Sequence, residues 1–171
     1  GGPRSALPVI DKRYGLPGLA EDADSGRWIE ADVKTPQGYT VTVVCVYVHA
    51  GNTDDPEKMK QKYRFLDTML VRMGQLRDDA AHGGKQAVLC GDFNIAHTPL
   101  DSKIAKANEK HAGFLPEERT YVDKWLGELE FVDVMRSLCG DIQGPNTWWS
   151  QRGRAFDNNV GWRSTTSSPH P

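Results

Sequence analysis

The sequence predicts an α/β fold in which helices cover β-sheets. Short apolar or β-branched runs and longer amphipathic runs follow one another in the order strand, strand, helix, strand, helix, strand, which is typical of layered domains. Residues 57–81 form one amphipathic run of helical length. The apolar run 87–90 is too short for a buried helix and fits a buried strand, which ends at Gly91 before the polar Asp92 and Asn94.

The composition indicates one globular domain. The 171 residues are 38% hydrophobic and 26% charged, and no apolar stretch approaches the ~20 residues of a membrane span, so no membrane partner is expected. The net charge of −2 excludes a global basic field and leaves a local basic patch open. Cys45, Cys90 and Cys139 lack zinc-type spacing and predict free thiols in a reducing, cytoplasmic compartment. The sequence begins at Gly1, with no initiator methionine and no apolar stretch of a signal peptide. We therefore expect the chain to begin inside a longer protein.

The amino-terminal part predicts a loop and a half-buried strand. Residues 1–26 are rich in Gly and Pro and indicate a loop with a short strand at residues 7–11. Residues 27–33 alternate between two faces, as a half-buried strand does. The apolar face carries Ile29, Ala31 and Val33, and the other face carries Trp28, Glu30 and Asp32.

A central strand and a long helix are predicted next. The β-branched run 39–48 has apolar residues on both faces and predicts a strand packed on both sides. Its carboxyl end carries Tyr47 and His49, which are two residues apart and therefore share a face. The helix over residues 57–81 is expected to pack its apolar stripe on the sheet; the stripe contains Met59, Tyr63, Leu66, Leu70 and Met73.

The carboxyl-terminal part is more irregular. Residues 98–112 are polar and lysine-rich, and Pro116 opens a second helix with acidic residues in its first turn. Residues 131–135 predict a short buried segment, and residues 147–149 a short aromatic strand. A loop at residues 152–163 combines cations, amides and aromatic rings.

Asp92 and Asn94 are the sharpest chemical signal. If the strand stays extended, the two side chains point the same way beyond its end. A carboxylate is a hard ligand for Mg²⁺ and can also orient an attacking water, while an amide can donate to a phosphoryl oxygen. The alternative interpretation is an Asx turn that closes the strand.

Three elements could converge on such a site. They are the strand end with Tyr47 and His49, the strand end with Asp92 and Asn94, and the loop 152–163. Each also has a plain structural interpretation: strand-end residues, a solvated lysine face, tryptophans packed in the core, and surface arginines. The residues alone therefore permit phosphate chemistry without defining a substrate.

Four stretches give the chain a specific resemblance. They are Val46-Tyr47-Val48, residues 108–119 from Asn108 to Arg119, Phe131-Val132-Asp133-Val134, and Thr147-Trp148-Trp149-Ser150 followed by Asn159-Val160-Gly161-Trp162-Arg163. With Gly91-Asp92-Phe93-Asn94 they resemble, in order, the exonuclease III family of DNA repair enzymes, the class II apurinic/apyrimidinic (AP) endonucleases. These belong to the endonuclease/exonuclease/phosphatase superfamily.

The resemblance implies a fold, an activity and a partner. The fold is the four-layer α-β-β-α sandwich of DNase I-like proteins, incomplete in this chain. The activity is Mg²⁺- or Mn²⁺-dependent hydrolysis of DNA backbones, by AP endonuclease and 3′–5′ exonuclease reactions. The partner is double-stranded DNA with abasic sites or 3′ ends, bound by a monomer.

The resemblance also implies roles for single residues. Asp92 orients or activates water, Asn94 bonds in the same centre, and Tyr47 contacts the scissile phosphate, with Asp92 and Asn94 forming part of the metal site. The DNA-facing residues implied are Asn108, His111, Trp148, Trp149, Arg152, Arg154, Asn159 and Trp162. Among them Trp148, Trp149 and Trp162 form the abasic-sugar pocket and its rim.

The chain departs from the family at both ends. It lacks the Asn and metal-binding Glu of the family's first strands and its later Ser-Asp-His element, for which His170 is no substitute. Residues 1–163 are thus interpreted as a partial domain and 164–171 as a non-family tail. Loss of one base in the Arg163 codon would turn the expected Arg-Ile-Asp-Tyr-Gln-Leu into Arg-Ser-Thr-Thr-Ser-Ser, so a frameshift is one hypothesis and a flexible tail the other. We expect the isolated chain to be poorly stable and at best weakly active.

Two rival functions stay open at this point. A phosphatase or phosphodiesterase acting on a non-DNA substrate would share the Gly91–Asn94 element. A non-catalytic DNA-binding module would share the aromatic and cationic loop.

Overall fold

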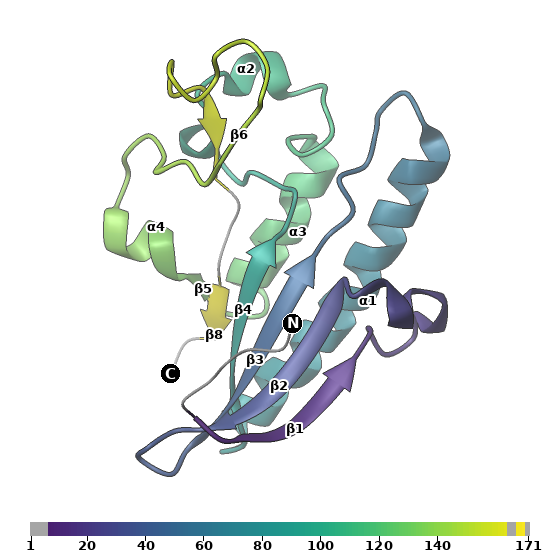
Figure 1. Cartoon of the computed structure of the whole chain (residues 1–171), viewed down its shortest axis with the longest axis vertical. Helices are drawn as coiled ribbons and strands as arrows, with labels where there is room; N and C mark the ends of the chain where they lie inside the picture. Colours follow the sequence, from purple (N-terminus) through teal and green to yellow (C-terminus); the bar gives the residue numbers. More distant parts are fainter. Residues whose placement is uncertain (1–6, 164–166, 170–171) are drawn as a thin grey trace.

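A six-stranded sheet forms the body of the molecule. The computed structural model describes residues 7–163, except the side chains of residues 21–23, together with the backbone of residues 167–169. The strand order in the sheet is β1-β2-β3-β4-β8-β5, and a separate two-stranded sheet pairs β6 with β7. Helices α1 and α3 lie behind the sheet in Figure 1, and both pack against its strands.

The described elements have the following bounds. The strands are β1 (Val9–Tyr14), β2 (Trp28–Lys34), β3 (Thr40–Tyr47), β4 (Gln86–Asp92), β5 (Phe131–Asp133), β6 (Trp148–Trp149), β7 (Gly161–Trp162) and β8 (Ser167–Pro169). The helices are η1 (Ala20–Ser25), α1 (Pro56–Ala81), η2 (Pro99–Asp101), α2 (Ala105–Asn108), α3 (Pro116–Gly127) and α4 (Val134–Cys139). None of the described helices combines the length and apolar character needed to cross a membrane.

Most predicted elements are present, with shifted ends. The first strand covers Val9–Tyr14 instead of residues 7–11. The predicted buried segment 131–135 divides into β5 and α4, because the Asp133 side chain accepts a hydrogen bond from the Arg136 N–H and caps the helix. Residues 167–169, expected to lie in a linker-like tail, pair as β8 between β4 and β5. Residues 164–166 and 170–171, including His170, lie outside the described residues, so the frameshift hypothesis stays a prediction.

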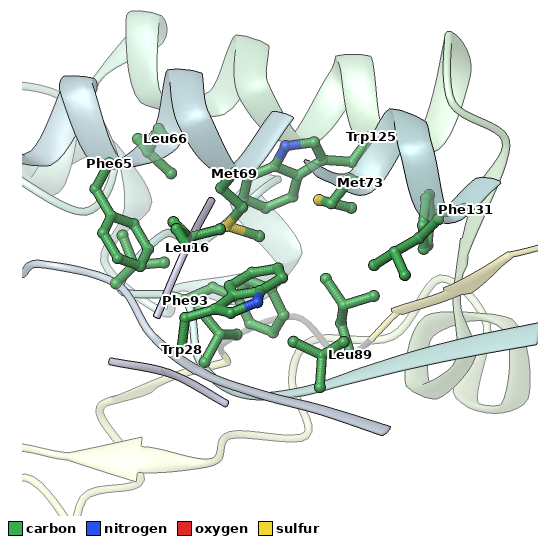
Figure 2. Close-up of a cluster of buried hydrophobic side chains, with 14 of the residues drawn as sticks. Leu16, Trp28, Phe65, Leu66, Met69, Met73, Leu89, Phe93, Trp125 and Phe131 are labelled. Carbon is green, nitrogen blue, oxygen red and sulfur yellow. The ribbon is translucent and has the colours of Figure 1, made fainter. Parts of the chain in front are cut away.

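The core lies between α1, α3 and one face of the sheet (Figure 2). Five fully or nearly fully buried α1 side chains form its helical side: Phe65, Leu66, Met69, Met73 and Leu76. The predicted stripe is therefore rotated, since Tyr63 and Leu70 pack only at its margin. The Met content of α1 is core packing, as the sequence indicates.

The inward face of β2 differs from the simplest expectation. The face that packs toward α1 carries Trp28, Glu30 and Asp32, all nearly fully buried, while Ile29 and Ala31 on the apolar face stay half-buried. Polar residues occupy the inner face because cations from other elements neutralise them there.

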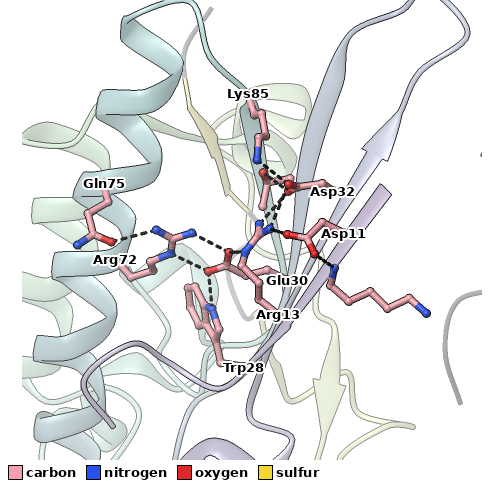
Figure 3. A network of polar contacts seen from close by, with 10 residues as sticks. Asp11, Arg13, Trp28, Glu30, Asp32, Arg72, Gln75 and Lys85 are labelled. Atoms are coloured by element: carbon pink, nitrogen blue, oxygen red, sulfur yellow. Dashed lines mark hydrogen bonds and ion pairs between the residues drawn. The ribbon is translucent and has the colours of Figure 1, made fainter. Parts of the chain in front are cut away.

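Those cations come from three places in the fold (Figure 3). Arg72 of α1 donates from Nε and Nη2 to the two Glu30 carboxylate oxygens, each over 2.7 Å. Arg13 of β1 bonds both Glu30 and Asp32, and Lys85 reaches Asp32 over 2.6 Å. The network thus fixes the edge strand, the neighbouring strand and the helix to one another.

The opposite face of the sheet is not fully covered within the described residues. Cys45 is exposed, and Val41, Val43 and Cys90 are only partly buried on this face. The prediction that residues 39–48 are packed on both sides is therefore wrong for this chain. An apolar but open sheet face agrees with a layered sandwich that is incomplete here.

Breaking the Glu30 pair should destabilise the fold. Arg72→Met should lower the free energy of unfolding at pH 7 by about 3 kcal/mol, because Glu30 then lies buried with one cation fewer. Burial raises the pKa of Glu30, but hydrogen bonds from Arg72, Trp28 and Arg13 outweigh burial and lower it from 4.5 to about 2. Because the pKa of Glu30 is lower in the folded state, its ionised carboxylate stabilises the fold at pH values above about 4.5. This stabilisation is lost as the pH falls from about 4.5 toward 2.

Urea denaturation at pH 7 and pH 3 measures this effect. The difference between Arg72→Met and wild type should shrink at pH 3. Lys60→Met, whose side chain on the same helix is 78% exposed, is the control and should change stability by less than about 0.5 kcal/mol. Equal stabilities of Arg72→Met and wild type at pH 7 would contradict the account.

Candidate active site

The parallel pairing of β3 with β4 brings the first site residues together. The register runs from Val41 opposite Gln86 to Tyr47 opposite Asp92, and the Val48 N–H donates to the Asp92 carbonyl over 2.9 Å. Because neighbouring strands lie about 4.8 Å apart, the two paired residues are neighbours on the same face at the carboxyl edge of the sheet. The Tyr47 side chain is 50% exposed, and its ring lies 4.7 Å from the guanidinium carbon of Arg27.

Gly91 permits the close approach of these strand ends. Its φ is +136°, and a Cβ built there would lie 2.0 Å from the Val46 carbonyl oxygen. Any other residue would therefore strain its own backbone and collide with the neighbouring strand.

Asp92 and Asn94 form a turn and a site wall at the same time. Asn94 has a left-handed φ of 48°, so the extended geometry assumed from the sequence is wrong at this residue. Its N–H donates to Asp92 Oδ1 over 2.9 Å, which is the Asx turn considered as the alternative. Its Nδ2 donates to the Val48 carbonyl over 2.8 Å and fixes the side chain to β3. The two interpretations are thus compatible, because both residues also line one cavity.

That cavity joins two of the three predicted elements. Its volume is about 370 Å³, and its lining joins Asp92 and Asn94 to Trp148, Trp162 and Arg163. The remaining lining residues are small or apolar: Ala50, Gly51, Ile95, Ala96, Ala112, Gly113 and Ser150. Figure 1 shows β6 beyond the carboxyl ends of β3 and β4, where this cavity lies.

Trp162 is held against the cavity by its neighbours. A Cβ at Gly113 would lie 3.5 Å from the Trp162 ring, so the absence of a side chain there leaves room for the indole. The Trp162 ring meets Phe114 edge to face with a centroid distance of 6.4 Å. Its backbone pairs with Trp148 in the small sheet and forms a bridge with Ser102.

Arg163 anchors this aromatic segment by a buried charge network that the sequence analysis did not single out. Its Nε donates to Asp101 Oδ1 over 2.6 Å, and its Nη1 and Nη2 donate to the two Asp133 oxygens over 3.0 and 2.7 Å. Arg136 adds a second contact to Asp101 over 2.5 Å. Burial lowers the pKa of Arg163, yet its two carboxylate partners outweigh burial and raise it, so Arg163 is charged. In the sequence, the one indication of this network is Asp133, an acid at the end of the apolar run that begins at Phe131.

The rest of the aromatic loop lies outside the cavity lining. Trp149 donates from Nε1 to Asn159 Oδ1 over 3.2 Å and meets Phe156 edge to face at 5.1 Å. Trp149 is thus not among the lining residues of the cavity, and its implied role in the sugar pocket or at its rim stays a prediction. Arg154 has a left-handed φ of 54° and pairs with Asp157 over 3.3 Å, and Arg152 is exposed.

The lysine-rich segment supplies one exposed and one buried candidate. His111 is exposed, with its Nδ1 3.0 Å from the Ala107 carbonyl oxygen. Asn108 is only 8% exposed and donates from Nδ2 to Ser102 Oγ over 2.9 Å. This hydrogen bond holds Ser102, whose backbone forms the β-bridge with Trp162. His49, by contrast with the exposed Tyr47, is buried. Its ring packs edge-on against Phe65 with a centroid distance of 5.5 Å.

The described residues offer only part of the ligand set that a divalent metal ion needs. Asp92 and Asn94 offer a carboxylate and an amide oxygen, which are the hard ligands that Mg²⁺ prefers. No group of three or more His, Cys, Asp or Glu side chains in the described ranges is placed to hold a metal ion. The donor set therefore fits a metal site in chemistry and lacks a full set of ligands.

Comparisons with known proteins identify the family. Residues 23–163 match the Endonuclease/Exonuclease/phosphatase family, so the chain belongs to it. An exodeoxyribonuclease of Bacillus subtilis is 46% identical over 150 residues, which cover 88% of this chain and 54% of that protein. A DNA-(apurinic or apyrimidinic site) endonuclease of Dictyostelium discoideum is 44% identical over 79 residues, 46% of this chain and 22% of that protein. The chain thus spans about half the length of the bacterial relative and less of the other.

Solved structures agree with this assignment. A 3′ phosphatase from Neisseria bound to a product DNA hairpin superposes with a TM-score of 0.81 at 27% identity, covering 98% of this chain and 60% of that one. An AP endonuclease from Archaeoglobus fulgidus superposes with a TM-score of 0.80 at 28% identity, covering 96% and 59%. The predicted DNase I-like α/β fold and the resemblance to exonucleases and AP endonucleases are confirmed.

Replacing Gly91 tests the geometry of the strand end. Gly91→Ala should lower the free energy of unfolding by at least about 3 kcal/mol, because the new methyl group collides with the Val46 backbone. The matched control is Gly74→Ala within α1, where the nearest atom to the added Cβ is Leu129 Cδ2 at 3.9 Å. That variant should gain up to about 1 kcal/mol from helix propensity. Denaturant melts that rank the two variants equally would contradict the predicted strand contact.

Proposed function

We propose that this chain carries the core of a Mg²⁺- or Mn²⁺-dependent DNA repair nuclease that cuts the backbone at abasic sites and trims 3′ ends. The observation that carries the proposal is the single cavity that Asp92 and Asn94 share with Trp148 and Trp162. Relatives named as exodeoxyribonuclease and as AP endonuclease support the same reaction class.

Asp92 is proposed to orient and deprotonate the attacking water. The Asn94 N–H holds the carboxylate through Oδ1, so the orientation of Asp92 relative to the cavity is fixed before substrate binds. Such preorganisation favours proton transfer from a water placed within hydrogen-bond reach.

Asn94 and Tyr47 are proposed to contact the phosphate. One Asn94 N–H is bound to Val48, which leaves its second N–H and its Oδ1 for phosphate or water. Tyr47 lies beside Asp92 on the neighbouring strand, and its hydroxyl can donate to a phosphate oxygen. A metal ion bound through Asp92 and Asn94, with further ligands, would supply Lewis-acid stabilisation of the phosphate charge.

Trp148 and Trp162 are proposed to receive the abasic sugar. A deoxyribose without its base is small and largely apolar on one face, which suits a cavity with small and apolar lining residues. Around the cavity, Arg152, Arg154 and His111 are proposed to contact backbone phosphates, because they are exposed cations or hydrogen-bonding groups. Trp149, Asn159 and Asn108 are proposed to act behind them, as their side chains bond within the protein.

The rival functions differ in what they require of the cavity. A phosphodiesterase for small substrates needs Asp92 and Asn94 but no aromatic wall, whereas Trp148 and Trp162 complete the cavity here. A non-catalytic DNA-binding module would need the aromatic wall but not Asp92. A cytoplasmic location, a monomeric state and the non-family origin of residues 164–171 stay predictions.

The substitution Asp92→Asn separates these functions. It keeps an oxygen to accept from the Asn94 N–H and removes the charge, so abasic-DNA binding should change less than threefold while incision falls at least ~10³-fold. The assay is single-turnover incision of a duplex with a tetrahydrofuran site, with Mg²⁺. The 171-residue chain should incise at best weakly, so the variant is measured in the chain extended by the flanking segments of the Bacillus subtilis relative.

Asp54→Asn, in the exposed loop before α1, is the matched control and should incise at the wild-type rate. Unchanged incision by Asp92→Asn would refute the mechanism. Absence of incision by the extended wild-type protein, with tight DNA binding retained, would favour the binding module.

A further inference from the structure

A lysine and a glutamate are completely buried behind the cavity. Lys62 in α1 and Glu118 in α3 have no exposed side-chain surface, and Lys62 Nζ lies 2.5 Å from Glu118 Oε1. Charged residues are rarely buried to this extent unless they are paired, and a buried pair is seldom more stabilising than well-packed apolar residues. The contacts of this pair therefore indicate what it does.

Lys62 binds the backbone on two sides of the cavity. Its Nζ donates to the Asn94 carbonyl over 2.9 Å and to the Ala50 carbonyl over 3.1 Å. The ion pair with Glu118 gives the ammonium ion a third partner. The ammonium thus joins the turn after β4 to the loop after β3.

Glu118 binds a third part of the wall. Its Oε2 accepts from the Gly113 N–H over 2.6 Å and from the Leu115 N–H over 3.0 Å. Gly113 lies beside the Trp162 ring, and its carbonyl accepts from the Ala96 N–H over 2.8 Å. The carboxylate thus fixes the segment on which Trp162 rests.

Three of the backbone groups held by this pair belong to residues that line the cavity. They are Ala50, Asn94 and Gly113. Neither charged side chain is itself a lining residue. Asn94 also has a left-handed φ of 48°, a conformation that needs support from surrounding contacts. The Asn94 N–H is bound by Asp92 and the Asn94 carbonyl by Lys62, so the peptide groups on both sides of this residue are held in place.

We propose that Lys62 and Glu118 are positioning residues, which set the Asp92–Asn94 turn and the Gly113 wall relative to each other. This inference rests on the proposed function for its catalytic consequence, but its structural content is independent of the substrate. The pair acts through backbone groups and touches no reacting atom. Removing it should loosen the turn and the wall while the sheet and helix core stay folded.

The test uses two variants of the 171-residue chain and one control. Lys62→Met removes the ammonium, and Lys62→Met with Glu118→Gln also removes the carboxylate charge, so no unpaired charge stays buried if the single variant fails to fold. Lys60→Met, two positions away on the exposed face of α1, is the matched control. The readout is the exchange rate of single amide protons, measured by ¹⁵N NMR.

The Asn94 and Gly113 amides should exchange at least ~10-fold faster in the folded Lys62 variants, with Val44 and Leu89 in the paired strands unchanged. The control should match wild type at all four amides. Unchanged exchange at Asn94 and Gly113 in a folded variant would overturn the proposal. Uniformly faster exchange throughout β3 and β4 would also overturn it, since the pair would then stabilise the whole domain without a positioning role.

Incision by the extended protein gives the second readout. In the double variant kcat should fall at least ~10-fold while KM changes less than threefold, because the turn is mispositioned and the DNA-contacting side chains are retained. A rise in KM as large as the fall in kcat would contradict a positioning role. If the extended wild-type protein does not cut abasic DNA, the proposed function fails, whereas the amide exchange still decides whether the pair positions the turn.

Discussion

The parallel pairing of β3 with β4 is the contact on which the rest of the site depends. Its register places Tyr47 opposite Asp92, and Gly91 allows the strand ends to approach without a side chain between them. The Val48 backbone then binds Asp92 and Asn94 on the neighbouring strand. A shift of one residue would send the Asp92 side chain to the helix-covered face, so this register decides whether a site exists.

Two buried charge networks complete the cavity around that strand pair. Arg163 fixes the aromatic segment through Asp101 and Asp133, and Lys62 with Glu118 fixes the backbone behind Asn94 and Gly113. In the first network Arg163, just beyond β7, binds acids at the ends of η2 and β5; in the second, helix side chains bind backbone groups of the loops around the cavity. The rigid elements thereby determine the shape of a site that is built mainly from loops.

The sequence predicted the groups that carry chemistry better than the groups that hold them. Asp92, Asn94 and Trp162 stand in local patterns that indicate a strand end or an aromatic loop, and the structure brings them to one cavity. The inward orientation of Glu30 was missed because its cations come from α1 and β1, far away in the chain. The contacts of Trp149 could not be predicted for a similar reason, since only the folded loop shows its bond to Asn159 and its contact with Phe156.

The central claim is that abasic DNA binds at the cavity between the β4 turn and the aromatic segment. An NMR titration of the ¹⁵N-labelled chain with a tetrahydrofuran-containing duplex tests it directly, because the lining indoles and amides report separately from the rest of the surface. The account predicts large shifts of the Trp148 and Trp162 indole N–H signals and of the Asn94 amide, with a smaller shift at Trp149, whose N–H bonds within the protein. Shifts confined to residues outside the cavity, such as Cys45 on the open sheet face, would contradict it.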